Sequence, residues 1–162
     1  MYSMNQGKDV AKQAARDIEA WLLSLPRTIS LVNVEDDPEY QKVDVDLLLT
    51  TNKDSYKLEI KGDRYHKTGN FFLETHSNKE RGTPGCFLYT AADWVLYYFV
   101  TPRTLYLLPM PATREWFTAN IDRFRERSTT TKTDRGFYTT VGRLVPINVV
   151  CDEVEGVRKL TL

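Results

Sequence analysis

The chain has 162 residues and a mass of 18.8 kDa, and 41% of its residues are hydrophobic while 27% are charged. This composition is ordinary for one globular domain and excludes collagen-like, low-complexity and wholly disordered proteins. Twenty-two basic residues balance 22 acidic ones, so net charge alone does not indicate nucleic-acid binding. No apolar run approaches the roughly 20 residues of a membrane span, and the polar residues 1–15 do not resemble a secretory leader. We expect one intracellular, cytoplasmic domain over residues 1–162 with no membrane partner.

Three segments have helical character. In residues 8–25 apolar side chains recur at helical spacing until Pro26 ends the pattern. A short helical turn is expected at 90–94. Residues 111–127 begin with a proline and carry apolar side chains on one face, which predicts a longer helix. The threonine-rich residues 128–135 that follow are expected to be flexible.

Strand-like segments of alternating or continuous apolar character lie between these helices. The predicted strands are 28–34, 42–50, 56–61, 70–75, 95–100, 105–108 and 144–150. A turn at 52–55 joins two of them into a hairpin, an acidic loop occupies 35–39, and Pro146 argues for an edge position of the last strand. This order of helices and strands predicts an α/β protein in which helices pack against a mixed β-sheet.

Acidic side chains interrupt the two apolar strands of this hairpin. Asp46 precedes three consecutive leucines, and Asp44 lies two positions before it. Because side chains alternate along a strand, Glu59 and Lys61 share one face of the partner strand and Ile60 takes the other. Burying a charge is costly unless it is paired or binds a metal, and Mg²⁺ prefers carboxylate oxygens. The hairpin therefore predicts a metal site, with a cross-strand salt bridge on an exposed face as the alternative.

Two further blocks follow the hairpin in order. Residues 68–74 read TGNFFLE, and a Pro-Gly pair at 84–85 precedes TAADW at 90–94. Together with Asp46…Glu59-Ile60-Lys61, these blocks resemble the PD-(D/E)XK nuclease superfamily, in particular its phage-type and Holliday-junction-resolvase-like members. The resemblance covers about a third of the chain.

The resemblance implies an α/β restriction-endonuclease-like fold with a mixed sheet flanked by helices and an αβββαβ-type core. It also implies an endonuclease that hydrolyses phosphodiester bonds in DNA with Mg²⁺ or Mn²⁺. Carried over by position, Asp46 and Glu59 bind the metal and are catalytic together with Lys61, which positions or activates water. Asp44 is the alternative metal ligand. Many members add an acid on the first helix, for which the candidates are Asp17 and Glu19.

Contacts to the substrate are expected from polar residues that follow the lysine. We consider Lys67, Asn70 and Glu74, with a turn amide at a strand edge as an equal alternative for the last two. Basic side chains gather in residues 53–81 and 114–135, where they predict phosphate contacts or, alternatively, a solvated face. Cys86 and Cys151 lack a zinc-like spacing, so we predict two buried, apolar cysteines.

Two other functions stay open. A non-catalytic nucleic-acid-binding or protein-interaction domain could retain the same fold, and a different metal-dependent hydrolase could use the same carboxylates. The sequence does not distinguish DNA from RNA. Because two strands are often cut by two subunits, a homodimer is one arrangement that the interpretation allows.

Overall fold

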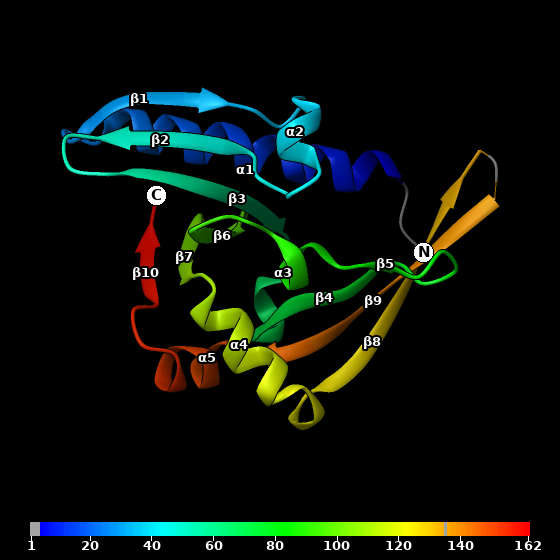
Figure 1. The fold of residues 1–162 in the computed structure, drawn as a ribbon. Coiled ribbons are helices and arrows are strands. Elements are labelled where there is room, and N and C mark those ends of the chain that lie inside the picture. The colour runs from blue at the N-terminus through cyan, green and yellow to red at the C-terminus, as the bar shows by residue number, and fades with distance from the viewer. Residues whose placement is uncertain (1–3, 135) are drawn as a thin grey trace.

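Two β-sheets and the helices around them make up the fold (Figure 1). The computed structural model describes residues 4–134 and 136–162. The helices are α1 (Met4–Ser24), α2 (Pro38–Gln41), α3 (Cys86–Tyr89), α4 (Ala112–Ala119) and α5 (Ile147–Glu153), with 3₁₀ turns at His66–Thr68 and Ile121–Arg123. The strands are β1 (Thr28–Asn33), β2 (Leu47–Thr51), β3 (Ser55–Asp63), β4 (Asn70–Asn78), β5 (Thr83–Pro84), β6 (Trp94–Phe99), β7 (Thr104–Pro109), β8 (Arg125–Thr133), β9 (Gly136–Pro146) and β10 (Arg158–Thr161). The predicted α/β class with a mixed sheet is confirmed.

The larger sheet has six strands in the order β1-β2-β3-β6-β7-β10. β3 and β6 are parallel, and the other neighbours in this sheet are antiparallel. The predicted hairpin is confirmed, because β2 pairs with β3 in a register that sets Leu47 opposite Leu58. The predicted pair of strands near residues 95–108 is also confirmed as β6 and β7.

Helix α1 covers one face of the six-stranded sheet. Its apolar stripe of Ala14, Ile18 and Leu22 is buried against leucines of β2 and β3, as the spacing of apolar residues predicted. The helix approaches β3 closely, since a Cβ added to Gly62 would lie 2.9 Å from the Cβ of Ala14. This packing turns Ile60 toward α1 and leaves Glu59 and Lys61 on the opposite face.

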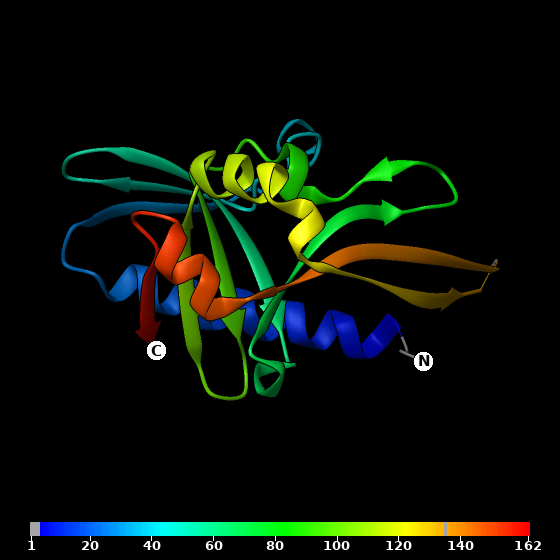
Figure 2. The same ribbon diagram turned by 90° about the horizontal axis from the view of Figure 1, so that it is seen from below.

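The opposite face of the sheet packs against the second sheet and the later helices. This second sheet has four strands in the order β5-β4-β9-β8, and all of its pairs are antiparallel. The core between the layers is aromatic: Phe71 of β4 packs edge-on against Tyr106 of β7, with ring centroids 5.1 Å apart. Figure 2 shows that the β8–β9 hairpin extends beyond the six-stranded sheet.

Four predictions about the second half of the chain are wrong in part. The predicted helix 111–127 ends at Ala119, and β8 covers both the end of that segment and most of the threonine-rich stretch. The predicted strand 144–150 is the end of β9 followed by α5, and Pro146 lies in an interior strand. Proline is tolerated there because it is the last residue of β9, where the ladder ends and α5 begins. Strand β10 was not predicted.

The segment before β2 also differs from its prediction. Residues 42–46 do not form the predicted strand, and β2 begins only at Leu47. They follow the short helix α2, which overlaps the end of the predicted acidic loop at residues 38 and 39. The predicted helical turn at 90–94 is displaced to α3, which ends at Tyr89. None of the helices in the described part of the chain is long and apolar enough to cross a membrane.

Candidate metal centre

Asp46 and Glu59 lie side by side where β2 and β3 separate. The backbone N–H of Asp46 donates to the carbonyl of Leu58, and the Asp46 carboxylate accepts a hydrogen bond of 2.8 Å from the backbone N–H of Ile60. This contact turns the Asp46 side chain toward β3, next to Glu59. The hairpin thus places Asp46 next to Glu59, and Lys61 lies two residues further along β3 on the face of Glu59.

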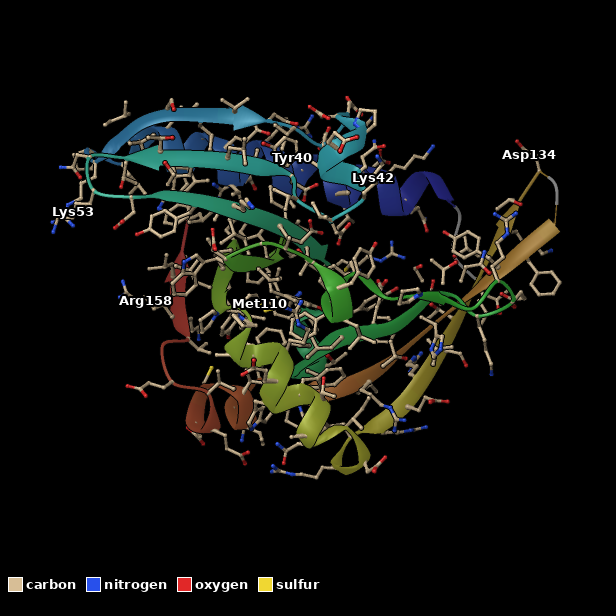
Figure 3. All side chains as sticks on the ribbon, in the orientation of Figure 1. Tyr40, Lys42, Lys53, Met110, Asp134 and Arg158 are labelled. Atoms are coloured by element: carbon tan, nitrogen blue, oxygen red, sulfur yellow. The ribbon has the colours of Figure 1, made fainter. Side chains whose placement is uncertain are left out.

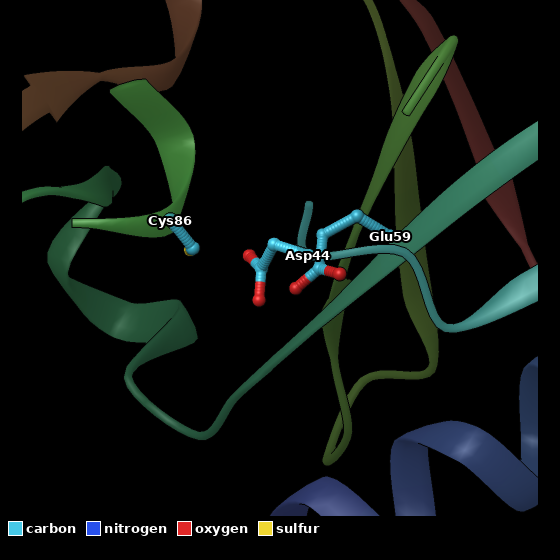
Figure 4. A group of neighbouring side chains, drawn as sticks. All are labelled: Asp44, Glu59 and Cys86. Carbon is cyan, nitrogen blue, oxygen red and sulfur yellow. The ribbon is translucent and has the colours of Figure 1, made fainter. Parts of the chain in front are cut away.

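Asp44 and Cys86 complete a tight group around Glu59. One ligand atom from each of Asp44, Glu59 and Cys86 lies within 4.8 Å of the other two. Figure 4 shows the carboxyl groups of Asp44 and Glu59 near each other, with Cys86 on the far side of Asp44. The Oδ2 atom of Asp44 and the Oε2 atom of Glu59 are buried and accept no hydrogen bond from the described residues. We call Asp44, Asp46 and Glu59 the carboxylate cluster.

Burial and mutual repulsion act on the pKa values of this cluster. Glu59 is only 7% exposed, and its pKa lies well above the ordinary 4.5, first because of burial and then because of the nearby Asp46 and Asp44 carboxylates. Burial likewise raises the pKa values of Asp44 and Asp46. Three acidic groups with two unpartnered buried oxygens therefore share a small volume, and a bound cation would relieve this cost.

Lys61 is the cation next to the cluster, and it is paired with Glu74 of β4. Burial alone would lower the pKa of the Lys61 ammonium group, but the Glu74 carboxylate outweighs that effect, and the pKa lies above its ordinary 10.5. Lys61 therefore stays protonated at neutral pH. In this state it can orient a water molecule or stabilise negative charge, but it cannot take up a proton.

The backbone of Asp44 is held in an unusual conformation by the segment before β6. Asp44 has a φ angle of 52°, in the left-handed region that non-glycine residues adopt only at a cost. The hydroxyl of Thr90 donates a 2.6 Å hydrogen bond to the carbonyl of Asp44, and the N–H of Ala91 donates to the carbonyl of Val43. These bonds fix the Asp44 carboxyl group beside Glu59. No helix follows Thr90, where the sequence predicted a helical turn at 90–94.

The Pro-Gly block places Cys86 at the same site. A Cβ added to Gly85 would lie 2.3 Å from the carbonyl oxygen of Glu74, so only glycine allows this approach of α3 to β4. The N–H of Gly85 donates to the carbonyl of Thr75, which secures the contact. The expectation of two buried cysteines is wrong, because Cys86 is half-buried and Cys151 is exposed. Burial raises the pKa of the Cys86 thiol.

The first-helix acids lie outside the cluster. Asp17 accepts hydrogen bonds from Tyr98 and Arg103, and Glu19 accepts one from the side chain of Asn33. Glu35, which follows β1, instead interacts electrostatically with Asp46: its pKa is raised by partial burial and then by the Asp46 carboxylate.

Glu35 and Cys86 are the two residues near the site that the sequence analysis missed. For Glu35 the strand register gave no signal, because it continues with Val34 opposite Asp46 and therefore sets Glu35 opposite Val45. For Cys86 the Pro-Gly block was noticed, but its close approach to β4 depends on the three-dimensional fold.

The three candidate substrate residues divide between the site and its surroundings. Glu74 belongs to the site through its ion pair with Lys61. The amide of Asn70 donates to the carbonyl of Thr68, which is the turn role considered as its alternative. Lys67 is exposed in the 3₁₀ turn His66–Thr68. The preceding residues Arg64 and Tyr65 line a groove that Lys61 also lines.

Comparison of the chain with models of protein families, with curated proteins and with solved structures found no match.

Proposed function

We propose that the protein is a Mg²⁺-dependent endonuclease that hydrolyses phosphodiester bonds in DNA. The observation that carries this proposal is the pair of buried, unpartnered carboxylate oxygens, on Asp44 and Glu59, beside the protonated Lys61. Mg²⁺ is bound in proteins by one or two carboxylates together with water and substrate phosphates. The donor set fits Mg²⁺ or Mn²⁺, because the cluster offers hard oxygen ligands and excess negative charge.

The order of elements supports a restriction-endonuclease-like core. Helix α1 is followed by the meander β1-β2-β3, and after the inserted strands β4 and β5 the chain returns through α3 to β6, parallel to β3. This sequence of elements agrees with the αβββαβ-type core that the PD-(D/E)XK resemblance implies. The pairing of β2 with β3 ends at Leu47 and Leu58, and the candidate catalytic residues Asp46, Glu59 and Lys61 lie just beyond this end.

In the proposed reaction Asp46 and Glu59 would hold the metal ion, with Asp44 as a third carboxylate beside them. Such an ion would supply Lewis acidity, which lowers the pKa of water and neutralises negative charge on the phosphate. Lys61 holds the attacking water in place and stabilises negative charge that develops on the phosphate oxygens. Glu74 acts through Lys61, because its ion pair fixes the direction of the ammonium group.

A cleavage panel tests this proposal directly. Purified protein is incubated with single-stranded, double-stranded and branched DNA in Mg²⁺, Mn²⁺, Ca²⁺ or excess chelator. We expect cleavage with Mg²⁺ and Mn²⁺, none with chelator, and binding without cleavage in Ca²⁺. Glu59→Gln is the matched negative control, because it keeps the size of the side chain and removes its charge. Cleavage that persists in chelator, or that the Glu59→Gln variant retains, would contradict the proposal, as would no cleavage with any cation.

A further inference from the structure

A groove opens beside the candidate metal centre. It has a volume of about 630 Å³ and lies between the first turns of α1, the end of β3, and strands β4, β8 and β9. Lys61 and Phe72 border both this groove and the small cavity that holds Glu59 and Glu74. The groove therefore adjoins the small cavity on which Glu59 lies, and its wall includes residues of the β8–β9 hairpin, which extends beyond the six-stranded sheet (Figure 2).

The charge of the groove favours a polyanion. Among the described residues, Lys8, Arg64 and Arg127 line it together with Lys61, whose charge is paired with Glu74, and the acidic residue in the lining is Asp63. The hydroxyl of Tyr97 donates a hydrogen bond to the Asp63 carboxylate, so part of the hydrogen-bonding capacity of this carboxylate is used within the protein. The whole chain carries no net charge, so the positive charge of the groove is a local feature that the total charge of the protein does not reveal.

Aromatic rings lie among these charges. Tyr65 is 43% exposed, and the guanidinium group of Arg64 lies 5.2 Å from the centre of its ring. Tyr138 of β9 and Phe72 of β4 line the groove from the second sheet. A positive groove with aromatic side chains is the arrangement by which proteins bind single strands, because bases stack on the rings while the backbone follows the charge.

We propose that this groove binds single-stranded DNA and delivers it to the metal centre. The inference rests on the proposed function, since it names the form of the substrate. The volume falls in the range of pockets that enclose small ligands, so it accommodates a few flexible nucleotides. A paired duplex cannot unstack its bases onto Tyr65 and Tyr138 without first losing its pairing.

Binding without cleavage tests this inference separately from the chemistry. Fluorescence anisotropy is measured with labelled oligo-dT, and with the same strand paired to oligo-dA, in excess chelator. We expect the single strand to bind at least about tenfold more tightly than the duplex. Equal or tighter binding of the duplex would overturn the inference. The chelator removes metal ions, so this assay measures binding without any cleavage. If the protein binds single strands here but never cleaves DNA with Mg²⁺, the proposed function is refuted and this inference is not.

Matched charge variants locate the binding surface. Arg64→Gln/Arg127→Gln removes two positive charges from the groove, whereas the control Arg158→Gln/Lys159→Gln removes two charges elsewhere. Arg158 and Lys159 both lie on β10, and Arg158 is far from the β8–β9 turn at Asp134 (Figure 3).

The slope of log K against log salt should become shallower by about 1.4 in the groove variant, because each single-strand phosphate contact contributes about 0.7. The control variant should keep the wild-type slope. Equal slopes in the two double variants would place the DNA outside the groove and overturn the inference.

Discussion

Two groups of buried or half-buried acids face opposite sides of the same sheet, and they differ in their partners. On the α1 side, the Asp17 carboxylate is 12% exposed and accepts hydrogen bonds from Gln13, Tyr98 and Arg103. On the other side, buried oxygens of Asp44 and Glu59 in the carboxylate cluster accept no hydrogen bond from residues 4–134 or 136–162. Satisfied buried carboxylates stabilise a fold, whereas unsatisfied ones cost free energy.

The difference indicates that the two acid groups serve different purposes. Asp17 ties α1 to the β6–β7 hairpin through Tyr98 and Arg103, and its role is complete within the chain. The carboxylate cluster differs, because buried oxygens of Asp44 and Glu59 have no hydrogen-bond partner in the described part of the chain. The predictions below compare the two groups from the largest expected effect to the smallest.

The largest expected difference concerns the basic residues that lie beside the two acid groups, Lys61 and Arg103, and their effects on the rate of DNA cleavage. Lys61→Ala should lower the rate of DNA cleavage by about 10²–10³-fold, because the variant loses a preorganised donor at the reacting phosphate. Folding and metal binding should stay nearly intact, as circular dichroism and Mn²⁺ titration would show. Arg103→Ala, which removes the cation beside Asp17, should leave the cleavage rate unchanged. A Lys61→Ala variant with full activity would remove the role given to this residue.

Neutralising one acid in each group should change stability in opposite directions. In metal-free protein, Glu59→Gln should raise the free energy of unfolding by roughly 1–3 kcal/mol at neutral pH, because an unsatisfied buried charge is removed. Asp17→Asn should lower it by a similar amount, because the acceptor for Tyr98 and Arg103 is weakened. Urea unfolding of both variants measures the two changes. A loss of stability in both would show that the two acid groups are equally satisfied.

The free energy of unfolding should change with pH in opposite directions for an acid with a raised pKa and an acid with a lowered pKa. The pKa of Glu59 is raised above its ordinary 4.5 by burial, so the folded state binds its proton more tightly than the unfolded state. The stability of metal-free protein should therefore fall as pH rises from 4.5 through the folded pKa, and Glu59→Gln should flatten this fall.

Glu153 provides the opposite case. Its hydrogen bonds with Arg123 and then Trp116 lower its pKa to about 2, so the stability that it contributes is present above 4.5 and is lost as pH falls toward 2. Glu153→Gln should change only this acid side of the profile in urea unfolding. A Glu59→Gln variant whose profile matches the wild type above pH 4.5 would contradict the raised pKa.

The hairpin that carries Asp46, Glu59 and Lys61 was predictable from the sequence because its physics is local. Alternating side chains and a four-residue turn determine which groups share a face. The covering helix α1 was predictable for a similar reason, since its apolar stripe is long and regular. These two elements place the centre of the candidate site.

Other parts of the site depend on contacts between distant segments. The φ angle of Asp44 is held by Thr90, 46 residues later, and Cys86 reaches the cluster only because Gly85 packs against Glu74. Strand β8 was mistaken for a flexible stretch because it is largely exposed and lacks an apolar face. Its threonines favour a strand, but its pairing with β9 is what decides the outcome.

Titration with Mn²⁺, followed by electron paramagnetic resonance of the unbound ion, tests the central claim most directly. We expect the wild-type protein to bind Mn²⁺ and Glu59→Gln to bind it at least about tenfold more weakly, with Asp17→Asn unchanged. Asp46→Asn should weaken binding more than Asp44→Asn, because the hydrogen bond from Ile60 already orients Asp46; the reverse order would make Asp44 the main ligand. Absence of Mn²⁺ binding by the wild type, or equal binding by Glu59→Gln, would contradict the account.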